Sequence, residues 1–335
     1  MLHKETIYIF GAGRIGKQFI LQLIANGVKN IYCVDIYANI EYLCYSLNYD
    51  SIYGRREDLF SVDKKKILNT QTGCEIHFLT SSKDITPELN SLAIDATGLK
   101  DFSLSLSDNF KRVYITNSAK ADFIDQYVIC GTADKLLKTS KYISTSICDA
   151  TALAASLDLI DTEYKIRCGH ITTLHPWLNY QNLSDGPVQL TSASTGYLED
   201  FGLGRKSTES LIAKSTTAIK ALQLCRNYVE NFSSNSFRVP TPIVSAAVIT
   251  VNTNYTINSS SDILNIFSKA KNITLTDRTR VSCDFIGMKA AAIVDIESVK
   301  INSPENQISL NLWYDNEAGY VSMVLDFIIN NEEGF

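Results

Sequence analysis

The stretch from Thr6 to Gly16 reads Thr-Ile-Tyr-Ile-Phe-Gly-Ala-Gly-Arg-Ile-Gly, and it decides the fold. Its first half, Thr6–Phe10, is β-branched and aromatic, which is typical of a buried strand. The glycine-rich second half follows directly, and apolar residues then repeat at helical spacing from Ile15 to Ile24, with Gly27 placed to end the helix. The stretch therefore predicts a strand, a glycine turn and a helix in direct succession.

A second predicted strand, Asn30–Asp35, ends on an acidic residue 19 positions after Gly16. This spacing fits a dinucleotide-binding βαβ unit. In such a unit Gly11 permits the tight turn, Gly13 lets the backbone approach a pyrophosphate, and Gly16 lets the helix pack closely on the strand. Asp35 would accept hydrogen bonds from the adenosine ribose hydroxyls. Because a carboxylate there disfavours a 2′-phosphate, the sequence predicts NAD rather than NADP; the alternative is a structural turn without a ligand.

The rest of the chain predicts an α/β protein with two domains. Three further strands would extend the parallel sheet: Leu92–Ala96, Arg112–Thr116 and Tyr142–Thr145. Longer strands are predicted afterwards at Tyr164–His175, Thr241–Val251, Ala290–Ile296 and Ile308–Tyr314. Helices are predicted at Ala150–Leu159, Lys206–Cys225, Ser261–Ala270 and Glu317–Ile329. We expect a Rossmann NAD-binding domain over residues 1–147, completed by the C-terminal segment 316–335, and a mixed α/β catalytic domain over 148–315.

Composition and charge exclude several function classes. Of the 335 residues, 45% are apolar and 20% charged, which is ordinary globular composition. The net charge of −5 gives no sign of a nucleic-acid or anionic-membrane surface. No apolar run approaches the ~18 residues of a membrane span and the start lacks a signal peptide, so a cytoplasmic location is expected. The eight cysteines contain no CxxC pair, which favours free thiols and predicts no metal site.

Two residues indicate covalent chemistry. Cys148 lies within Ser144–Thr151, where a strand gives way to a helix. The positive end of a helix dipole favours the thiolate form of a cysteine. A lone cysteine is more often a packed core residue than a nucleophile. His175, at the end of a predicted strand within Ile171–Trp177, supplies the second group that a nucleophilic cysteine needs.

The order and spacing of these segments resemble the glyceraldehyde-3-phosphate dehydrogenase family over essentially the whole chain. Six segments carry the resemblance: Gly11–Gly16, Tyr49–Arg55, Ser144–Ala154, Thr172–His175, Phe237–Pro242 and Trp313–Tyr320. Two of them, Phe-Arg-Val-Pro-Thr-Pro and Trp-Tyr-Asp-Asn-Glu-Ala-Gly-Tyr, are close to verbatim. The resemblance implies the family's fold, a homotetramer without nucleic-acid or membrane partners, and a loop after Trp177 that lies near a neighbour's cofactor.

The resemblance also implies an NAD-dependent oxidoreductase acting on a small-molecule aldehyde. Cys148 would attack the aldehyde to give a thiohemiacetal that is oxidised to a thioester, with His175 as base and hydrogen-bond donor. Asn316 would orient the nicotinamide amide. The implied substrate-binding positions are Arg238, Arg205, Asp149 and Thr216. The implied cofactor-binding positions are Gly11, Gly13, Arg14, Ile15, Gly16, Asp35, Thr97, Gly98, Asn316 and Tyr320.

Most phosphate-coordinating positions of the family are replaced in this chain. The replacements are Ile147, Asp149 and Ala150 around the cysteine, Leu178 and Tyr180 after the histidine, Gly202, and Thr217 at the end of Ser215–Thr217. Each charge-assisted phosphate contact contributes about 1.5 to 3 kcal/mol, so losing several removes most of the affinity. The carboxylate of Asp149 would also repel a dianion. We therefore expect an aldehyde other than glyceraldehyde 3-phosphate and water as the acyl acceptor.

Two alternatives remain open at the level of sequence. One is an authentic phosphorylating dehydrogenase of glyceraldehyde 3-phosphate or erythrose 4-phosphate with a shifted phosphate site. The other is an NAD-binding regulatory protein that has lost catalysis. The retention of Cys148, His175, Arg238 and Asn316 favours an enzyme, because random drift would not spare the chemical groups selectively.

Overall fold

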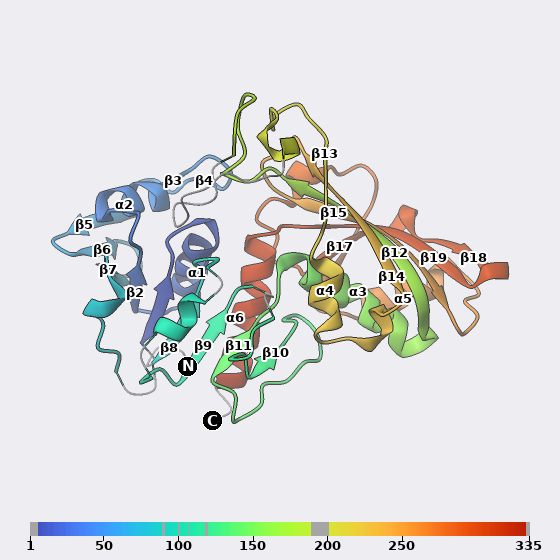
Figure 1. Ribbon diagram of the computed structural model, residues 1–335, viewed down its shortest axis with the longest axis horizontal. Coiled ribbons are helices and arrows are strands. Elements are labelled where there is room, and N and C mark those ends of the chain that lie inside the picture. Colours follow the sequence, from blue (N-terminus) through green and yellow to red (C-terminus); the bar gives the residue numbers. More distant parts are fainter. Residues whose placement is uncertain are drawn as a thin grey trace. The chain divides into compact units, whose positions relative to one another are not determined.

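The computed structural model describes residues 6–88, 91–99, 101–106, 108–117, 120–188 and 201–332, and Figure 1 shows it as a ribbon. The chain forms two compact units. The N-terminal unit consists of Met1–Thr151 together with Glu317–Phe335, and the C-terminal unit consists of Ala152–Asn316. The end of the chain therefore returns to the unit in which the chain began. No helix among the described residues has both the length and the apolar character that a bilayer span requires.

The N-terminal unit is built on a sheet to which the described residues contribute nine strands, in the order β10-β11-β9-β8-β1-β2-β7-β6-β5. Its strands are β1 (Ile7–Phe10), β2 (Asn30–Val34), β5 (Phe60–Asp63), β6 (Lys66–Asn69), β7 (Glu75–Leu79), β8 (Leu92–Asp95), β9 (Arg112–Ile115), β10 (Gln126–Tyr127) and β11 (Tyr142–Ser144). The strands from β10 to β7 run parallel, and the hairpin of β5 and β6 adds antiparallel edge strands. A short separate hairpin joins β3 (Tyr49–Asp50) and β4 (Gly54–Arg55).

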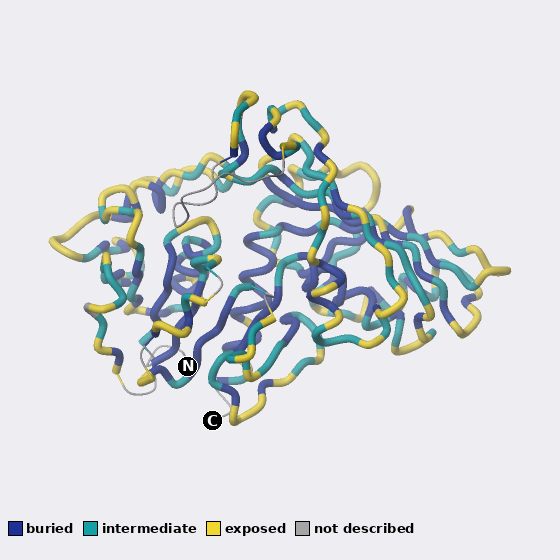
Figure 2. Tube along the Cα trace, in the orientation of Figure 1, coloured by how far each residue is buried: buried dark blue, intermediate teal, exposed yellow. Residues whose placement is uncertain are grey.

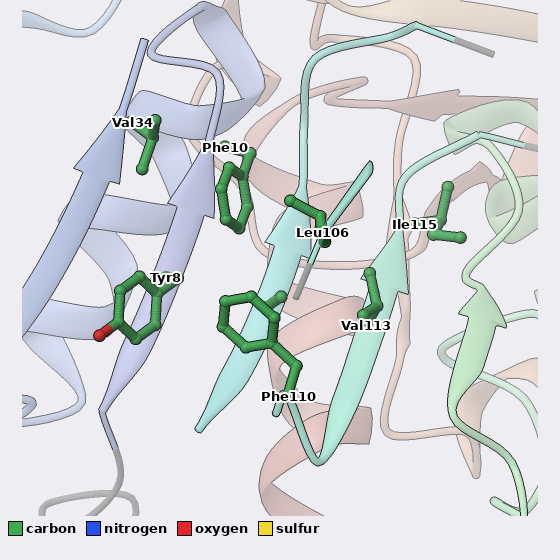
Figure 3. Packing of buried hydrophobic residues seen from close by; sticks show 8 residues of the cluster. Tyr8, Phe10, Val34, Leu106, Phe110, Val113 and Ile115 are labelled. Atoms are coloured by element: carbon green, nitrogen blue, oxygen red, sulfur yellow. The ribbon is translucent and has the colours of Figure 1, made fainter. Parts of the chain in front are cut away.

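Apolar side chains from neighbouring strands form a core on this sheet. Tyr8 and Phe10 of β1 belong to one buried cluster with the ring of Phe110 and with Val113 of β9, as Figure 3 shows. The ring centroids of Tyr8 and Phe110 are 5.2 Å apart in an edge-to-face arrangement that aromatic pairs prefer. All four β1 residues are buried, and Figure 2 shows the strand as a continuous buried segment. Such uninterrupted apolar strands are typical of parallel sheets covered on both faces.

Among the described residues, three α-helices lie entirely within the N-terminal unit: α1 (Arg14–Ala25), α2 (Ile40–Asn48) and α6 (Ala318–Glu332). Helix α1 buries the residues that repeat at helical spacing, among them Phe19 and Leu23. The start of α6 is tied to α1, because the side-chain amide of Gln22 donates to the carbonyl oxygen of Ala318 at 3.0 Å. These contacts make the C-terminal helix an integral part of the first unit.

A buried ionic cluster fixes the far end of α6 to the sheet. The carboxylate of Glu332 is almost fully buried and accepts hydrogen bonds from Arg112 at 2.8 and 2.9 Å. The hydroxyl of Tyr114 donates to the same carboxylate at 2.6 Å, and Lys111 pairs with it at 2.6 Å. Burial, followed by the charge of Glu332, raises the pKa of Tyr114 far above its ordinary value, so this hydroxyl remains a donor. Both ends of α6 are thus held by specific polar contacts.

The C-terminal unit contains a mixed sheet with the strand order β13-β14-β12-β15-β19-β17-β16, and β18 pairs with β19. The strands are β12 (Ile166–Pro176), β13 (Ile212–Lys214), β14 (Phe232–Val239), β15 (Ser245–Thr253), β16 (Ile273–Thr276), β17 (Ala292–Asp295), β18 (Lys300–Asn302) and β19 (Gln307–Tyr314). Its helices are α4 (Ala218–Gln223), which packs on β14, α5 (Ser260–Ser268), which packs on β16, and most of α3 (Cys148–Tyr164). This arrangement and the parallel sheet of the first unit confirm the fold class expected from the sequence.

Two element predictions are wrong. The helix expected over Lys206–Cys225 is limited to α4, because the segment before it forms β13 and the hydroxyl of Thr216 binds the backbone N–H of Ala218 at 3.0 Å. The strand expected from Thr241 begins only at Ser245. Two prolines precede it, at 240 and 242, and proline lacks the N–H that a sheet requires. Strand β14 was not foreseen, because its polar sequence lacks the usual apolar alternation.

Candidate active site

The glycine turn between β1 and α1 places two glycines where no other residue fits. Gly11 has a φ of +94°, and a Cβ atom there would lie 2.8 Å from the carbonyl oxygen of Ala96. A Cβ at Gly16 would lie 1.8 Å from the carbonyl oxygen of Gly11, so the helix can approach the strand only without a side chain. The turn therefore has the close backbone packing that a dinucleotide-binding unit requires.

The N-terminus of α1 is open to solvent. Gly13 is its N-cap and no side chain caps the helix. A Cβ at Gly13 would meet no described atom within 4 Å, and Arg14 beside it is exposed. The partial positive charge of a helix N-terminus and its unpaired N–H groups favour an anion at this point. The residues present therefore fit the pyrophosphate of a dinucleotide.

Asp35 follows the carboxyl end of β2 and is held by backbone N–H groups. Its Oδ2 accepts from Ala12 at 2.7 Å, while its Oδ1 accepts from Tyr37 at 2.7 Å and from Ala38 at 2.8 Å. An ionised carboxylate offers about four acceptor positions, so these bonds occupy most of its capacity. Asp35 thus has a structural task as well: it ties the glycine turn to the segment after β2.

Thr97 and Gly98 follow the carboxyl end of β8, next to the glycine turn. The backbone N–H of Thr97 donates to Asp95 at 3.0 Å, and its hydroxyl donates to the same carboxylate at 2.7 Å. Burial raises the pKa of Asp95, even though these bonds and one from Ser103 favour its charged form. Gly98 has a φ of +70°. Both residues therefore lie at the carboxyl edge of the sheet, beside the glycine turn, with the Thr97 side chain engaged inside the protein.

Two cations of α1 are paired with carboxylates. Arg14 binds Glu317, the first residue of the returning segment, and the hydroxyl of Tyr53 donates to the same carboxylate at 3.2 Å. Lys17 pairs with Asp50 at 3.4 Å. Burial alone would lower the pKa of Arg14, but its contact with Glu317 raises it. The predicted cofactor residue Arg14 is therefore part of an internal ion pair.

Cys148 is the first residue of α3, which begins two residues before the helix predicted at Ala150–Leu159. Its side chain is half-buried, and its Sγ lies 3.5 Å from Oδ1 of Asp149, which is 5% exposed. The thiol donates to the carboxylate in this arrangement. Ser146, two residues earlier, has a φ of +62°, a conformation that costs a residue with a side chain about 1 to 2 kcal/mol. The nucleophile candidate thus follows a strained turn.

A buried tyrosine of α6 supports this turn. The hydroxyl of Tyr320 donates to the carbonyl oxygen of Ser146 at 3.2 Å and lies 2.9 Å from the hydroxyl of Thr145. Tyr320 is 4% exposed, and burial raises its pKa well above the ordinary value. The structure therefore places Tyr320 behind the cysteine turn, with its hydroxyl engaged inside the protein.

The other cysteines differ widely in exposure. Cys33, Cys44 and Cys74 are buried, and burial raises the pKa of each thiol. For Cys74 the raised pKa is about 11. Cys283, in contrast, is exposed, and Cys168 and Cys225 are half-buried. Labelling of thiols in this protein therefore has to be resolved peptide by peptide.

In the C-terminal unit, His175 and Arg238 lie side by side. They are register partners on the parallel strands β12 and β14, so both side chains lie on the same face of the sheet. The guanidinium of Arg238 donates to the carbonyl oxygen of Pro176 at 3.1 Å. The sequence separates these residues by 63 positions, and the strand pairing brings them together.

Comparisons with known proteins agree with this geometry. Residues 147–316 match the model of the family described as glyceraldehyde 3-phosphate dehydrogenase, C-terminal domain. Glyceraldehyde-3-phosphate dehydrogenase of Buchnera aphidicola is 32% identical over 96% of this chain and 97% of its own. The chain belongs to the glyceraldehyde-3-phosphate dehydrogenase family. Two further relatives cover 96% of this chain: glyceraldehyde-3-phosphate dehydrogenase 1 of Schizosaccharomyces pombe, 28% identical, and the cytosolic enzyme of Leishmania mexicana, 27% identical.

In the segment after His175, Tyr180 is part of an apolar patch. Tyr180, which replaces an aspartate in the pattern that the sequence resembles, packs against Val188, Leu203 and Ile212. Arg205 pairs with Asp185 at 2.7 Å, and both side chains are largely exposed. Thr216 binds the start of α4. The predicted substrate positions Arg205 and Thr216 therefore make local contacts in the described residues, and residues 189–200 of the predicted specificity loop lie outside them.

Several buried polar atoms in the described chain have no hydrogen-bond partner. They include Thr241 Oγ1, Ser245 Oγ and Asn316 Oδ1 in the C-terminal unit, and Ser146 Oγ and Thr151 Oγ1 on either side of Cys148. Asn316 is the family position expected to orient the nicotinamide amide, and an unpaired amide oxygen fits a donor from a ligand. Ser245 and Thr241 were not predicted from the sequence, because isolated hydroxyl residues near a Pro-Thr-Pro segment give no distinctive pattern.

Proposed function

We propose that this protein oxidises an aldehyde with NAD as the two-electron acceptor and releases the free carboxylic acid. The balanced reaction consumes one aldehyde, one NAD⁺ and one water, and yields the carboxylate, NADH and two protons. The observation that carries the proposal is the buried carboxylate of Asp149 beside the sulfur of Cys148. Family membership supports the oxidation of an aldehyde. The carboxylate of Asp149 supports water, rather than inorganic phosphate, as the acceptor of the acyl group.

The cofactor proposal depends on the N-terminal unit. The open helix N-terminus at Gly13 suits a pyrophosphate, and Asp35 supplies a fixed negative charge at the end of β2. A 2′-phosphate at that point would meet a like charge, which supports NAD over NADP. The unpaired Asn316 oxygen suits the amide of a nicotinamide. When bound, the cofactor supplies the oxidising equivalent of the reaction.

The covalent step belongs to Cys148. Its sulfur attacks the carbonyl carbon of the aldehyde and forms a C–S bond, while the carbonyl oxygen becomes the thiohemiacetal hydroxyl. Family resemblance assigns the proton transfers to His175, which takes the thiohemiacetal proton as the carbon is oxidised to a thioester. Water then attacks the thioester, the C–S bond breaks, and the thiol of Cys148 is restored. The carboxylate of Asp149 is the base proposed to activate this water.

Phosphate is a poor acceptor for electrostatic reasons. The family pattern has hydroxyl residues at the positions of Ile147, Asp149 and Ala150, and the chain offers two apolar groups and a carboxylate instead. The carboxylate would lie next to an incoming phosphate dianion and raise its energy, whereas neutral water meets no such barrier. The thioester is therefore proposed to be hydrolysed.

Arg238 is the proposed anchor for the substrate. Its guanidinium lies beside His175 and is oriented by the carbonyl of Pro176. Because Arg205 is paired with Asp185 and Tyr180 is packed in an apolar patch, the remaining cationic contact suits a single anionic group rather than a fully coordinated phosphate. We propose an aldehyde other than glyceraldehyde 3-phosphate that carries a carboxylate or a comparable anion.

The proposed oligomeric state and cellular location are taken from the family. A homotetramer is expected from the family resemblance, and the name of the cytosolic Leishmania enzyme supports a cytoplasmic location. Sedimentation of the purified protein measures the assembly directly, and a monomer would contradict that part of the proposal.

The decisive experiment follows NADH formation with a panel of phosphorylated and unphosphorylated aldehydes, with and without inorganic phosphate. We expect turnover that does not depend on phosphate, and a free acid as product. Cys148→Ser is the matched control: it should abolish oxidation and leave NAD affinity within a few-fold, since the thiolate serves only the covalent step. A rate proportional to added phosphate, with an acid-labile acyl phosphate as product, would restore the phosphorylating reaction. NAD binding without turnover of any aldehyde would favour the regulatory alternative.

A further inference from the structure

The turn that leads into α3 holds a residue in an unfavourable conformation. Ser146 has a φ of +62°, a region that residues with a Cβ atom adopt only when their surroundings impose it. Its own hydroxyl is buried and has no partner within the described chain, so the serine side chain does not stabilise the turn. The force that keeps Ser146 in this conformation has to come from groups that bind its backbone.

That support comes from the neighbouring part of the chain and from two further elements. Within the chain, the hydroxyl of Ser144 accepts from the backbone N–H of Ser146 at 3.3 Å. On the sheet side, the backbone N–H and the hydroxyl of Thr145 donate to the carbonyl oxygen of Ile115 at 2.9 and 3.1 Å. On the helix side, the hydroxyl of Tyr320 donates to the carbonyl oxygen of Ser146 at 3.2 Å, and its oxygen lies 2.9 Å from Thr145 Oγ1. Tyr320 is therefore the side chain of α6 that holds the Ser146 peptide group directly.

The hydroxyl of Tyr320 remains a donor under all ordinary conditions. It is buried, and burial raises its pKa well above the ordinary value, although the bond to Thr145 acts in the other direction. The ionisable groups that face it from neighbouring elements are the thiols of Cys130 and Cys148. The hydroxyl of Tyr320 is therefore protonated at neutral pH and can donate to the carbonyl oxygen of Ser146.

The conformation of Ser146 determines where Cys148 lies. Only Ile147 separates the two residues, and the carbonyl of Ile147 accepts from the N–H of Thr151 at 3.0 Å, which closes the first turn of α3. A rotation at Ser146 would move that whole first turn. The sulfur would then leave its place at the N-terminal end of the helix, where a thiolate is favoured.

We infer that Tyr320 is a positioning residue that holds the left-handed Ser146 turn and thereby places the Cys148 sulfur at the N-terminus of α3. The inference rests on Cys148 being the nucleophile of the proposed function. It assigns Tyr320 a role behind the cysteine, distinct from the cofactor contact expected from the sequence. Its substitution should lower the reactivity of one thiol without requiring any substrate.

The test measures the rate at which iodoacetamide alkylates Cys148 in the full-length protein without NAD or aldehyde. Digestion and mass spectrometry separate Cys148 from the accessible Cys168, Cys225 and Cys283. Tyr320→Phe removes one hydroxyl and should slow alkylation by roughly three- to tenfold, the effect of a single lost hydrogen bond. Because the readout needs neither cofactor nor substrate, failure of the proposed reaction and failure of this inference are distinguishable.

Tyr114→Phe is the matched control. It also removes a buried tyrosine hydroxyl bonded to a partner across the sheet and α6, but its partner is Glu332 at the far end of the helix. We expect both variants to lower the unfolding temperature and only Tyr320→Phe to slow the alkylation of Cys148. Equal slowing in both would indicate a general effect of stability and would overturn the inference.

A second experiment tests whether a substitution at Ser146 restores the alkylation rate of the Tyr320→Phe variant. Glycine adopts positive φ at little cost, so Ser146→Gly makes the support of Tyr320 unnecessary. The double variant of Ser146→Gly and Tyr320→Phe should alkylate Cys148 within twofold of the Ser146→Gly protein. A tenfold slowing that persists in the glycine background would contradict the inference. If Tyr320→Phe alone does not fold, the double variant decides: a folded protein with a normal rate supports the inference, and a protein that still does not fold overturns it.

Discussion

The sulfur of Cys148 and the carboxylate of Asp149 lie 3.5 Å apart at the first turn of α3. The helix N-terminus favours a negative charge, and two neighbouring groups compete for that position. A carboxylic acid is far more acidic than a thiol, so Asp149 carries the charge and Cys148 remains a hydrogen-bond donor. From the ordinary acidities of the two groups, we expect a thiol beside a carboxylate in the resting pair.

Asp149→Asn should make Cys148 more reactive. Removing the like charge favours the thiolate, and we expect the midpoint of alkylation against pH to move about one unit toward lower pH. Peptide-resolved alkylation between pH 5 and pH 10 measures the shift, and Asp149→Glu is the control that keeps the charge. If Asp149 is also the base for water, the asparagine variant should accumulate the thioester. An unchanged alkylation profile would show that the carboxylate does not act on the sulfur.

Asp35→Asn should relax the discrimination against NADP. The asparagine keeps one oxygen for the N–H groups of Tyr37 and Ala38 but loses the charge and the bond to Ala12. We expect the NAD-to-NADP affinity ratio to fall roughly tenfold, about 1.4 kcal/mol. Titration of each cofactor by protein fluorescence measures both affinities. A wild-type preference for NADP would mean that Asp35 does not face the ribose, and Arg55 would be the next residue to substitute.

Arg238→Ala should raise the apparent KM for the aldehyde by roughly ten- to a hundredfold, with kcat changed less, because a charge-assisted contact to substrate contributes about 1.5 to 3 kcal/mol. Arg205→Ala is the matched control, since that guanidinium is exposed and paired with Asp185. Steady-state kinetics of both variants gives the comparison. If Arg205→Ala raises the KM more than Arg238→Ala does, Arg205 rather than Arg238 binds the anionic group of the substrate.

Asp50 and Asp95 should contribute to stability with opposite dependence on pH. Burial would raise the pKa of Asp50, but the N–H groups of Tyr53 and Ile52 and the charge of Lys17 lower it overall. Its contribution is present above the unfolded value of 3.8 and is lost as pH falls through the folded value. For Asp95 burial raises the pKa, so its ionisation is unfavourable to folding at neutral pH and the penalty disappears in acid.

Urea unfolding at pH 7 and pH 3 measures these contributions. Relative to wild type, Asp50→Asn should be destabilised at pH 7 and should approach the wild type at pH 3. Asp95→Asn should show the reverse trend: as the pH falls, the free energy of unfolding of the wild type should rise relative to that of the variant. Parallel pH dependences for the two variants would contradict the assignment of opposite shifts.

The sequence was most informative where structure is local. The glycine turn, the first helix and the acidic end of β2 all lie within 30 residues, and each is specified by close backbone packing or by helical spacing. The position of Cys148 at the start of α3 follows in the same way, because the strand-to-helix change is visible in its neighbours. Family resemblance then supplied the residue types of the site.

Long-range pairing could not be predicted in this way. The register pairing of His175 with Arg238 depends on β14, a polar strand whose residues have no apolar alternation. The bond from Tyr320 to Ser146 joins positions 174 residues apart. The use of Asp35 by three backbone N–H groups is likewise invisible in sequence, because an acidic residue at the end of a strand looks the same whether it binds a ribose or its own turn.

The return of α6 to the first unit constrains the order of events during synthesis. A ribosome adds roughly 5 to 20 residues per second, and the whole of Ala152–Asn316 has to be translated before α6 emerges. For roughly ten seconds or more, the nascent N-terminal unit exists without the helix that carries Tyr320 and Glu332. During that interval Arg112 and Tyr114 lack their buried carboxylate partner, and the cysteine turn lacks its support. The turn that precedes Cys148 therefore gains its contact with Tyr320 only after the C-terminal unit has been translated.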